Sequence, residues 1–128
     1  KPSPRRFGGA YPESEPEVKA ITEILRRVHF HRLYSFHSQG EEIFFEYGKN
    51  TPENSLLIAK ALAGVTGYTL VCNAGHCSSG GLKDWFIEEF KESAFTIEIG
   101  KGKNPLPVER FEEIYQKIEP LAVLGLML

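Results

Sequence analysis

The chain has 128 residues, of which 41% are hydrophobic and 25% charged, so it is long enough to bury the core of one globular domain. Its 15 basic and 17 acidic residues give a net charge of −2, which excludes the basic surface typical of nucleic-acid binding. No stretch approaches the roughly 18 consecutive apolar residues of a membrane span, so we expect neither nucleic acid nor membrane as a partner.

The first residues, KPSPRRFGGAYPESEP, are rich in proline and glycine and have no apolar periodicity. This composition is typical of a connection. Since the chain also begins with Lys1 rather than methionine, we expect it to be the C-terminal segment of a longer protein. The sequence SEPE at residues 14–17 then fits a capping box with proline in the first turn. Apolar residues follow at helical spacing, which predicts a helix over residues 15–28.

Two strands and a second helix come next in the chain. Side chains alternate over residues 30–36, which predicts a strand with His37 at its C-terminal end. Residues 42–47, EIFFEY, form a second strand rich in aromatic residues. The dipeptide Thr51-Pro52 opens a further helix, which ends near residues 64–67.

The remaining residues begin with a long irregular stretch. Residues 68–81, YTLVCNAGHCSSGG, have the composition of a loop, and long loops in compact domains are often functional. A short helix over residues 82–90, a strand over residues 93–100 and a final amphipathic helix over residues 108–118 follow. Helices therefore alternate with strands, which predicts an α/β fold with helices packed on a sheet.

Two polar side chains follow apolar runs at the ends of predicted strands. His37 follows RLYSF and Glu98 follows AFTI. Because functional groups of open α/β sheets gather at the carboxyl ends of the strands, an imidazole and a carboxylate there suit a metal site. By spacing alone, each residue fits equally a structural or solvated side chain at a strand end.

Three segments of the sequence are, in chain order, FHSQGEEIFFEYG, SSGGLKDWF and SAFTIEIG. Together they resemble the C-terminal half of the catalytic domain of the zinc carboxypeptidase family, the M14 type. The segment ESEPEVKAI before the first strand matches the family as well, so the resemblance covers nearly all of the chain. It implies the C-terminal part of that family's phosphorylase/hydrolase-like fold, with helices on a mixed sheet. It also implies that residues 1–128 are one segment of a metallopeptidase domain whose upstream half is absent.

The resemblance assigns roles to three residues. His37 matches the family's third zinc ligand, and Glu98 matches the glutamate that takes a proton from the attacking water and passes it to the leaving amine. His76 occupies the loop position where the digestive enzymes carry a tyrosine, and NAGHCSSGGLKDWF looks like the bacterial branch that cleaves γ-D-glutamyl–diaminopimelate bonds. His76 would close over the substrate and hydrogen-bond the scissile amide or its oxyanion. The alternative is an exposed loop histidine.

Lys83, two residues after Gly81, matches the position that lines the family's pocket for the side chain beyond the scissile bond. We expect both Lys83 and Gly81 to bind substrate. A lysine there favours a carboxylate, as carried by diaminopimelate or an acidic residue. The alternative for Lys83 is a surface lysine on a helix face. Zinc is the implied cofactor, with one Zn²⁺ in each intact catalytic domain.

The family's upstream His-x-x-Glu pair has no counterpart in this sequence. The residues three positions after the four histidines are Arg32, Tyr34, Gly40 and Ser79. Because zinc sites use three or four protein ligands, we expect this segment alone to hold no zinc and to be inactive. The absent half would also leave a sheet edge exposed, through which a homodimer would form.

These observations favour a zinc-dependent peptidase that hydrolyses γ-D-glutamyl–diaminopimelate bonds in peptidoglycan-derived peptides. One alternative is a non-catalytic module of the same fold that binds peptidoglycan peptides or a protein. Another is a general metallocarboxypeptidase. The bacterial cytoplasm and the cell wall both stay open as the location.

The other candidate groups are weaker. Cys72 and Cys77 either close a small ring or stay reduced, and a metal site that joins them to His76 matches no standard spacing. We expect His29 and His31 to be structural or solvated.

Overall fold

The computed structural model describes residues 9–72 and 81–128, in two compact units, Lys1–His31 and Arg32–Leu128. The first unit contains helix α1 (Pro16–Arg27), close to the predicted bounds. The predicted capping box does not form, because the N-cap residue is Glu15 and, among the described residues, the Ser14 hydroxyl accepts no hydrogen bond from an amide of the first turn. It donates instead to the Glu15 carboxylate at 2.8 Å.

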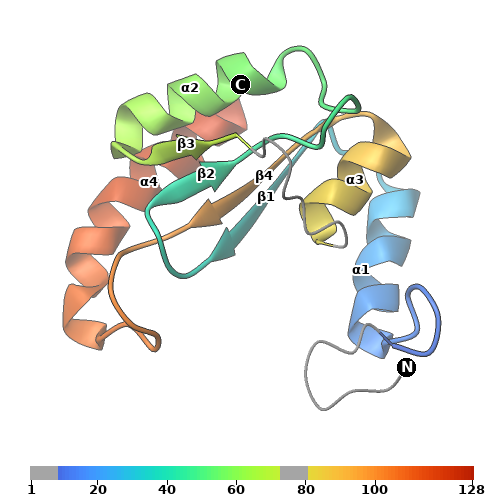
Figure 1. Ribbon diagram of the computed structural model, residues 1–128, viewed down its shortest axis with the longest axis horizontal. Coiled ribbons are helices and arrows are strands. Elements are labelled where there is room, and N and C mark those ends of the chain that lie inside the picture. The colour runs from blue at the N-terminus through green and yellow to red at the C-terminus, as the bar shows by residue number, and fades with distance from the viewer. Residues whose placement is uncertain (1–8, 73–80) are drawn as a thin grey trace. The chain divides into compact units, whose positions relative to one another are not determined.

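The second unit is built on a four-stranded mixed sheet with the strand order β1-β4-β2-β3 (Figure 1). Strand β1 is parallel to β4, β2 is parallel to β3, and β2 runs antiparallel to β4. The strands are β1 (Arg32–His37), β2 (Glu42–Phe44), β3 (Thr69–Val71) and β4 (Ser93–Glu98). The helices of this unit are α2 (Ser55–Thr66), α3 (Leu82–Phe90), the 3₁₀ turn η1 (Val108–Arg110) and α4 (Phe111–Met127).

The hydrophobic core lies between one face of the sheet and helices α2 and α4. Its fully buried members include Ile43 of β2, Phe95 and Ile97 of β4, Leu62 of α2 and Leu121 of α4. Helix α3 packs against β4 and β1. The predicted α/β class, with helices packed on a mixed sheet, is confirmed. No helix in the described part of the chain is both long and apolar enough to cross a membrane.

The structure corrects several predicted bounds. The stretch predicted as a loop from residue 68 begins with β3, whose three residues are too few to show an alternating pattern. Strand β2 ends at Phe44 rather than at residue 47. Helix α2 begins at Ser55 rather than near Thr51, because the Thr51 hydroxyl accepts from the Tyr47 amide at 2.7 Å and closes a turn. Helix α4 continues past residue 118 to Met127.

Candidate active site at the ends of β1 and β4

His37 and Glu98 are the last residues of two neighbouring parallel strands. The register of β1 and β4 pairs them directly, His37 with Glu98. Register partners of a sheet point to the same face, about 4.8 Å apart in the direction of the backbone hydrogen bonds. The His37 side chain is exposed and Glu98 is half-buried. An imidazole and a carboxylate therefore stand side by side at the sheet edge.

A third titratable group extends this pair into a row. Glu42, the first residue of β2, is the register partner of Glu98 on the other side of β4. The core residues Ile43 and Ile97 are neighbours in sequence of Glu42 and Glu98, so the row lies on the sheet face opposite the core. Glu42 is the first residue of the predicted strand over residues 42–47, but the sequence did not single it out as a site residue, because local patterns do not show the register between β2 and β4.

Two hydroxyl groups lie on the same face, one row further into the sheet. Ser35 of β1 pairs with Thr96 of β4, two residues before His37 and Glu98. The Ser35 Oγ is buried and has no hydrogen-bond partner in the described part of the chain. The sheet face next to the row therefore carries polar side chains, of which the Ser35 hydroxyl is buried.

The segments that leave β1 and β4 are tied to each other by four hydrogen bonds. The Ile99 amide donates to the His37 carbonyl at 2.8 Å, and the Gly40 amide donates to the Gly100 carbonyl at 2.8 Å. The Asn104 side-chain amide donates to the Ser38 carbonyl at 2.8 Å, and the Ser38 hydroxyl donates to Asn104 Oδ1 at 3.0 Å. These bonds hold the backbone just beyond both candidate site residues.

A groove of about 890 Å³ opens beside Ser38, the residue after His37. Most of its lining is apolar and comes from α4 and from the segment between β4 and η1. The side chains of α4 in this lining are Phe111, Ile114, Tyr115 and Ile118. The groove offers apolar contact next to the strand ends.

Lys83, expected to contact substrate, is buried on α3 with a side-chain exposure of 7%. Its ammonium donates to the Glu46 carbonyl at 2.7 Å and forms an ion pair with the buried carboxylate of Asp84. The alternative of a surface lysine is therefore wrong. Gly81 is exposed and is the N-cap of α3.

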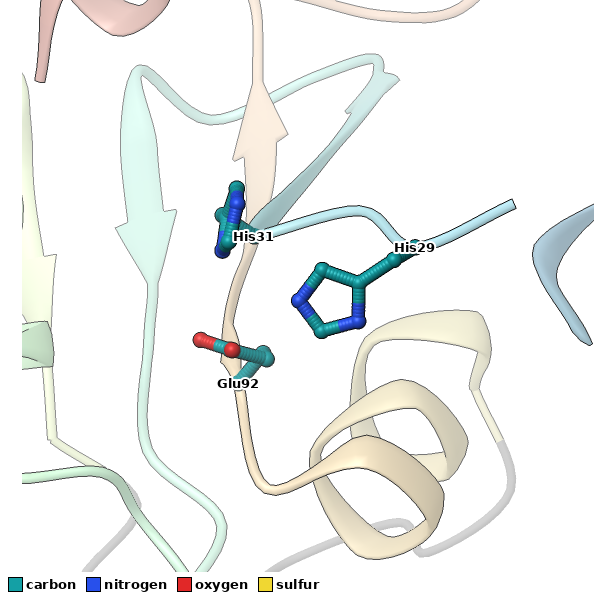
Figure 2. A group of neighbouring side chains, drawn as sticks. All are labelled: His29, His31 and Glu92. Carbon is teal, nitrogen blue, oxygen red and sulfur yellow. The ribbon is translucent and has the colours of Figure 1, made fainter.

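The other candidates lie in three places. His76 and Cys77 fall in residues 73–80, outside the described residues, whereas Cys72 is exposed. His29 and His31 belong to the first unit, where their rings meet edge to face with centroids 4.6 Å apart (Figure 2). The figure also labels Glu92, the residue directly before β4.

Comparison with known proteins identifies the family. The sequence profile of the M14 peptidases, described as zinc carboxypeptidase, matches residues 1–120. The chain is 35% identical over 127 residues to gamma-D-glutamyl-L-diamino acid endopeptidase 1 of Lysinibacillus sphaericus, covering 99% of this chain and 32% of the relative. It is 36% identical over 113 residues to human carboxypeptidase B2, covering 73% of this chain and 26% of the relative.

The fold agrees with this assignment. The crystal structure of thrombin activatable fibrinolysis inhibitor superposes with a TM-score of 0.76 at 26% identity, over 91% of this chain and 34% of that one. The chain thus spans about a third of the length of the curated relatives it matches first. From the matching profile and the shared fold together, the chain belongs to the M14 zinc carboxypeptidase family.

Proposed function

We propose that the full-length protein of which this chain is a segment is a zinc peptidase that hydrolyses the amide bond between γ-D-glutamate and a diamino acid such as diaminopimelate. The observation that carries the proposal is the register pair of His37 and Glu98 at the ends of β1 and β4. The substrate class is supported by the similarity to a gamma-D-glutamyl-L-diamino acid endopeptidase over 99% of this chain. Peptidoglycan-derived peptides contain such bonds.

The donor set at this edge suits part of a zinc site. Imidazole is a preferred zinc ligand, and the exposed end of β1 leaves that of His37 accessible. The remaining ligands would come from the upstream part of the protein, because catalytic zinc sites use three protein ligands. When bound, zinc supplies Lewis acidity toward the scissile carbonyl and lowers the pKa of water.

The residues of this chain supply the groups for proton transfer and for substrate binding. Glu98 accepts a proton from the attacking water and then donates it to the nitrogen of the leaving amine. His76 hydrogen-bonds the scissile amide or its oxyanion. Lys83 and Gly81 bind a carboxylate of the substrate. Two of the three N–H groups of the Lys83 ammonium donate to Glu46 and Asp84, and the third donates to this carboxylate.

A general metallocarboxypeptidase is the second candidate function. The similarity to human carboxypeptidase B2 over 73% of this chain supports it. The two functions differ in the bond that is cleaved, because a general carboxypeptidase acts on ordinary α-linked C-terminal residues. A non-catalytic binding module is the third candidate and differs from both in needing no zinc.

The test uses the full-length protein and its Glu98→Gln variant, with Glu112→Gln as the control because Glu112 is exposed on α4 and bonds only Gln116 in the described structure. Zinc is measured by elemental mass spectrometry after dialysis, and hydrolysis is measured on L-alanyl-γ-D-glutamyl-diaminopimelate and on an α-linked tripeptide. We expect about one zinc per chain in all three proteins. The turnover of Glu98→Gln should be lower by about 100- to 10,000-fold.

The other outcomes separate the candidates. Cleavage of the α-linked peptide alone would favour the general carboxypeptidase. Absence of zinc after metal is added back would favour the binding module. Zinc in place, with most of the turnover retained by Glu98→Gln, would show that Glu98 is not the base.

A further inference from the structure

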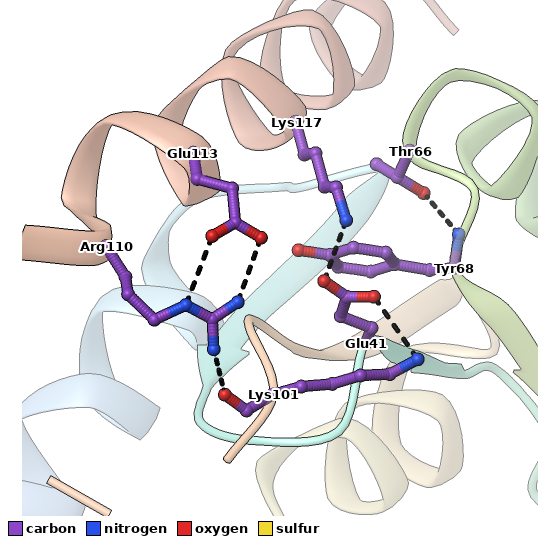
Figure 3. Close-up of polar contacts among 7 residues, drawn as sticks. All are labelled: Glu41, Thr66, Tyr68, Lys101, Arg110, Glu113 and Lys117. Atoms are coloured by element: carbon purple, nitrogen blue, oxygen red, sulfur yellow. Dashed lines mark hydrogen bonds and ion pairs between the residues drawn. The ribbon is translucent and has the colours of Figure 1, made fainter. Parts of the chain in front are cut away.

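The turn between β1 and β2 carries a carboxylate with unusual surroundings. The side chain of Glu41 is only 13% exposed although it lies in a turn. Its Oε1 accepts a hydrogen bond from Lys117 Nζ at 2.7 Å, and its Oε2 lies 3.4 Å from Lys101 Nζ (Figure 3). Each oxygen of the carboxylate is thus matched by its own lysine, one from α4 and one from the segment after β4.

The backbone of Glu41 is also held in a particular conformation. Its φ of 56° lies in the left-handed region, which non-glycine residues adopt only at an energetic cost. The Glu41 carbonyl accepts from the Thr69 amide at 2.9 Å, which joins the turn to the start of β3. The preceding residue, Gly40, donates to the Gly100 carbonyl. The surrounding contacts therefore determine where this carboxylate stands.

The partners of Glu41 are anchored in turn. The Lys117 ammonium lies 5.7 Å from the centre of the Tyr68 ring, a cation–π distance. Arg110 donates to the Lys101 carbonyl. Its guanidinium also forms a bidentate ion pair with the Glu113 carboxylate, in which the closer contact is 2.9 Å (Figure 3). Lys117 of helix α4 therefore holds the turn after β1, and Arg110 of η1 holds the segment after β4.

The contact between Glu41 and Lys117 keeps its charges across neutral pH. The hydrogen bond from Lys117 lowers the pKa of the Glu41 carboxyl below its ordinary 4.5, and the same bond raises the pKa of Lys117 above its ordinary 10.5. The stabilisation from Glu41 is present above pH 4.5 and is lost as the pH falls through the lowered pKa. The stabilisation from Lys117 is lost only as the pH rises above 10.5. Between these limits both groups stay charged, so the stabilisation from this ion pair does not change with pH.

We propose that Glu41 is a positioning residue for the candidate active site. It lies four residues after His37, and its partner Lys101 lies three residues after Glu98. By joining the segments that leave β1 and β4, it sets the separation and the orientation of the imidazole and the carboxylate. The inference rests on the proposed function, because the separation matters for catalysis only where both groups act on one substrate.

The effect of such a residue differs from that of an ordinary ion pair. Outer contacts that orient a metal ligand alter metal affinity or activity by about 10- to 100-fold when they are removed. An exposed ion pair that stabilises only the fold would leave both unchanged, since it does not alter where the ligand stands. Measurements of zinc affinity and of local order at the strand ends therefore distinguish a positioning residue from one that only stabilises the fold.

The test uses the full-length protein with Glu41→Gln and Lys101→Met, and Glu112→Gln as the control. Hydrogen exchange by mass spectrometry follows the amides of Gly40 and Ile99, which bond across the two segments. We expect exchange at these amides to be about tenfold faster in both variants, with the control unchanged. Zinc affinity, measured by competition with a chelator, should fall by about 10- to 100-fold in Glu41→Gln.

A lower melting temperature in Glu41→Gln with zinc affinity and both amides as in the wild type would overturn the inference. If Glu41→Gln does not fold, Lys101→Met decides in the same way, because it keeps the contact between Glu41 and Lys117. A wild-type protein that neither binds zinc nor cleaves peptides would refute the proposed function instead. In that case the exchange at Gly40 and Ile99 still decides whether Glu41 orders the strand ends.

Discussion

At the scale of single residues, Lys83 shows how burial constrains a charged side chain. Its ammonium and the Asp84 carboxylate are both shielded from water, with side-chain exposures of 7% and 10%. A buried charge needs a partner, because the loss of hydration is not otherwise offset. Lys83 therefore contributes to the stability of α3 whether or not it also binds substrate.

The variant Lys83→Met tests this structural contribution. It leaves Asp84 buried without its cation, and we expect the free energy of unfolding to fall by about 3 to 5 kcal/mol. Urea unfolding of the full-length protein measures the change, with Lys60→Met as the control because Lys60 is exposed on α2. Equal stability of the two variants would mean that Asp84 finds another partner. A raised KM for the diaminopimelate peptide in a folded Lys83→Met protein would support the substrate contact.

At the scale of elements, the turn after β4 depends on a glycine for two separate reasons. Gly100 has a φ of 67°, which side chains other than glycine's rarely tolerate. A Cβ at this position would also lie 2.7 Å from Leu106 Cδ1 and 2.9 Å from Ile114 Cδ1. The segment after Glu98 can therefore approach α4 closely only because residue 100 lacks a side chain.

We expect Gly100→Ala to destabilise the full-length protein by about 2 kcal/mol or more, from backbone strain and overpacking together. Gly64→Ala is the matched control, because Gly64 lies within α2 and a Cβ there meets nothing within 4 Å. Alanine favours a helix, so the control should be neutral or up to about 1 kcal/mol more stable. Thermal unfolding compares the two, and similar melting temperatures would argue against the tight turn.

At the scale of the whole molecule, the sheet of the second unit has β1 at one edge. Phe36 on this strand is 46% exposed, and every residue of β1 is at least partly exposed. Unpaired strand edges with apolar side chains promote association with another chain. The proposed homodimer would use this edge.

We therefore expect the 128-residue segment by itself to dimerise with increasing concentration and to bind a hydrophobic dye. Light scattering and dye fluorescence measure both properties. Phe36→Lys should weaken association, because a charge at an edge opposes pairing, whereas Leu57→Lys on α2, at a side chain that is 73% exposed, should not. A monodisperse monomer without dye binding would rule out association through β1.

Local sequence determined several features correctly. The bounds of α3 match the predicted helix over residues 82–90, since apolar spacing along these nine residues is a local signal. The ends of β1 and β4 likewise place His37 and Glu98 where apolar runs stop. The α/β class follows from the same alternation of helical and extended periods, because both periods are properties of neighbouring residues.

Tertiary structure decided how these elements meet. The register that sets His37 beside Glu98 and Glu42 joins three strands, two of which are separated by more than fifty residues of sequence. The lysine from α4 that bonds Glu41 lies 76 residues away from it, and the burial of Lys83 depends on the carbonyl of Glu46. Periodicity reports which face of an element is apolar, whereas partners across the sheet are selected by packing between distant segments, so only the folded chain specifies them.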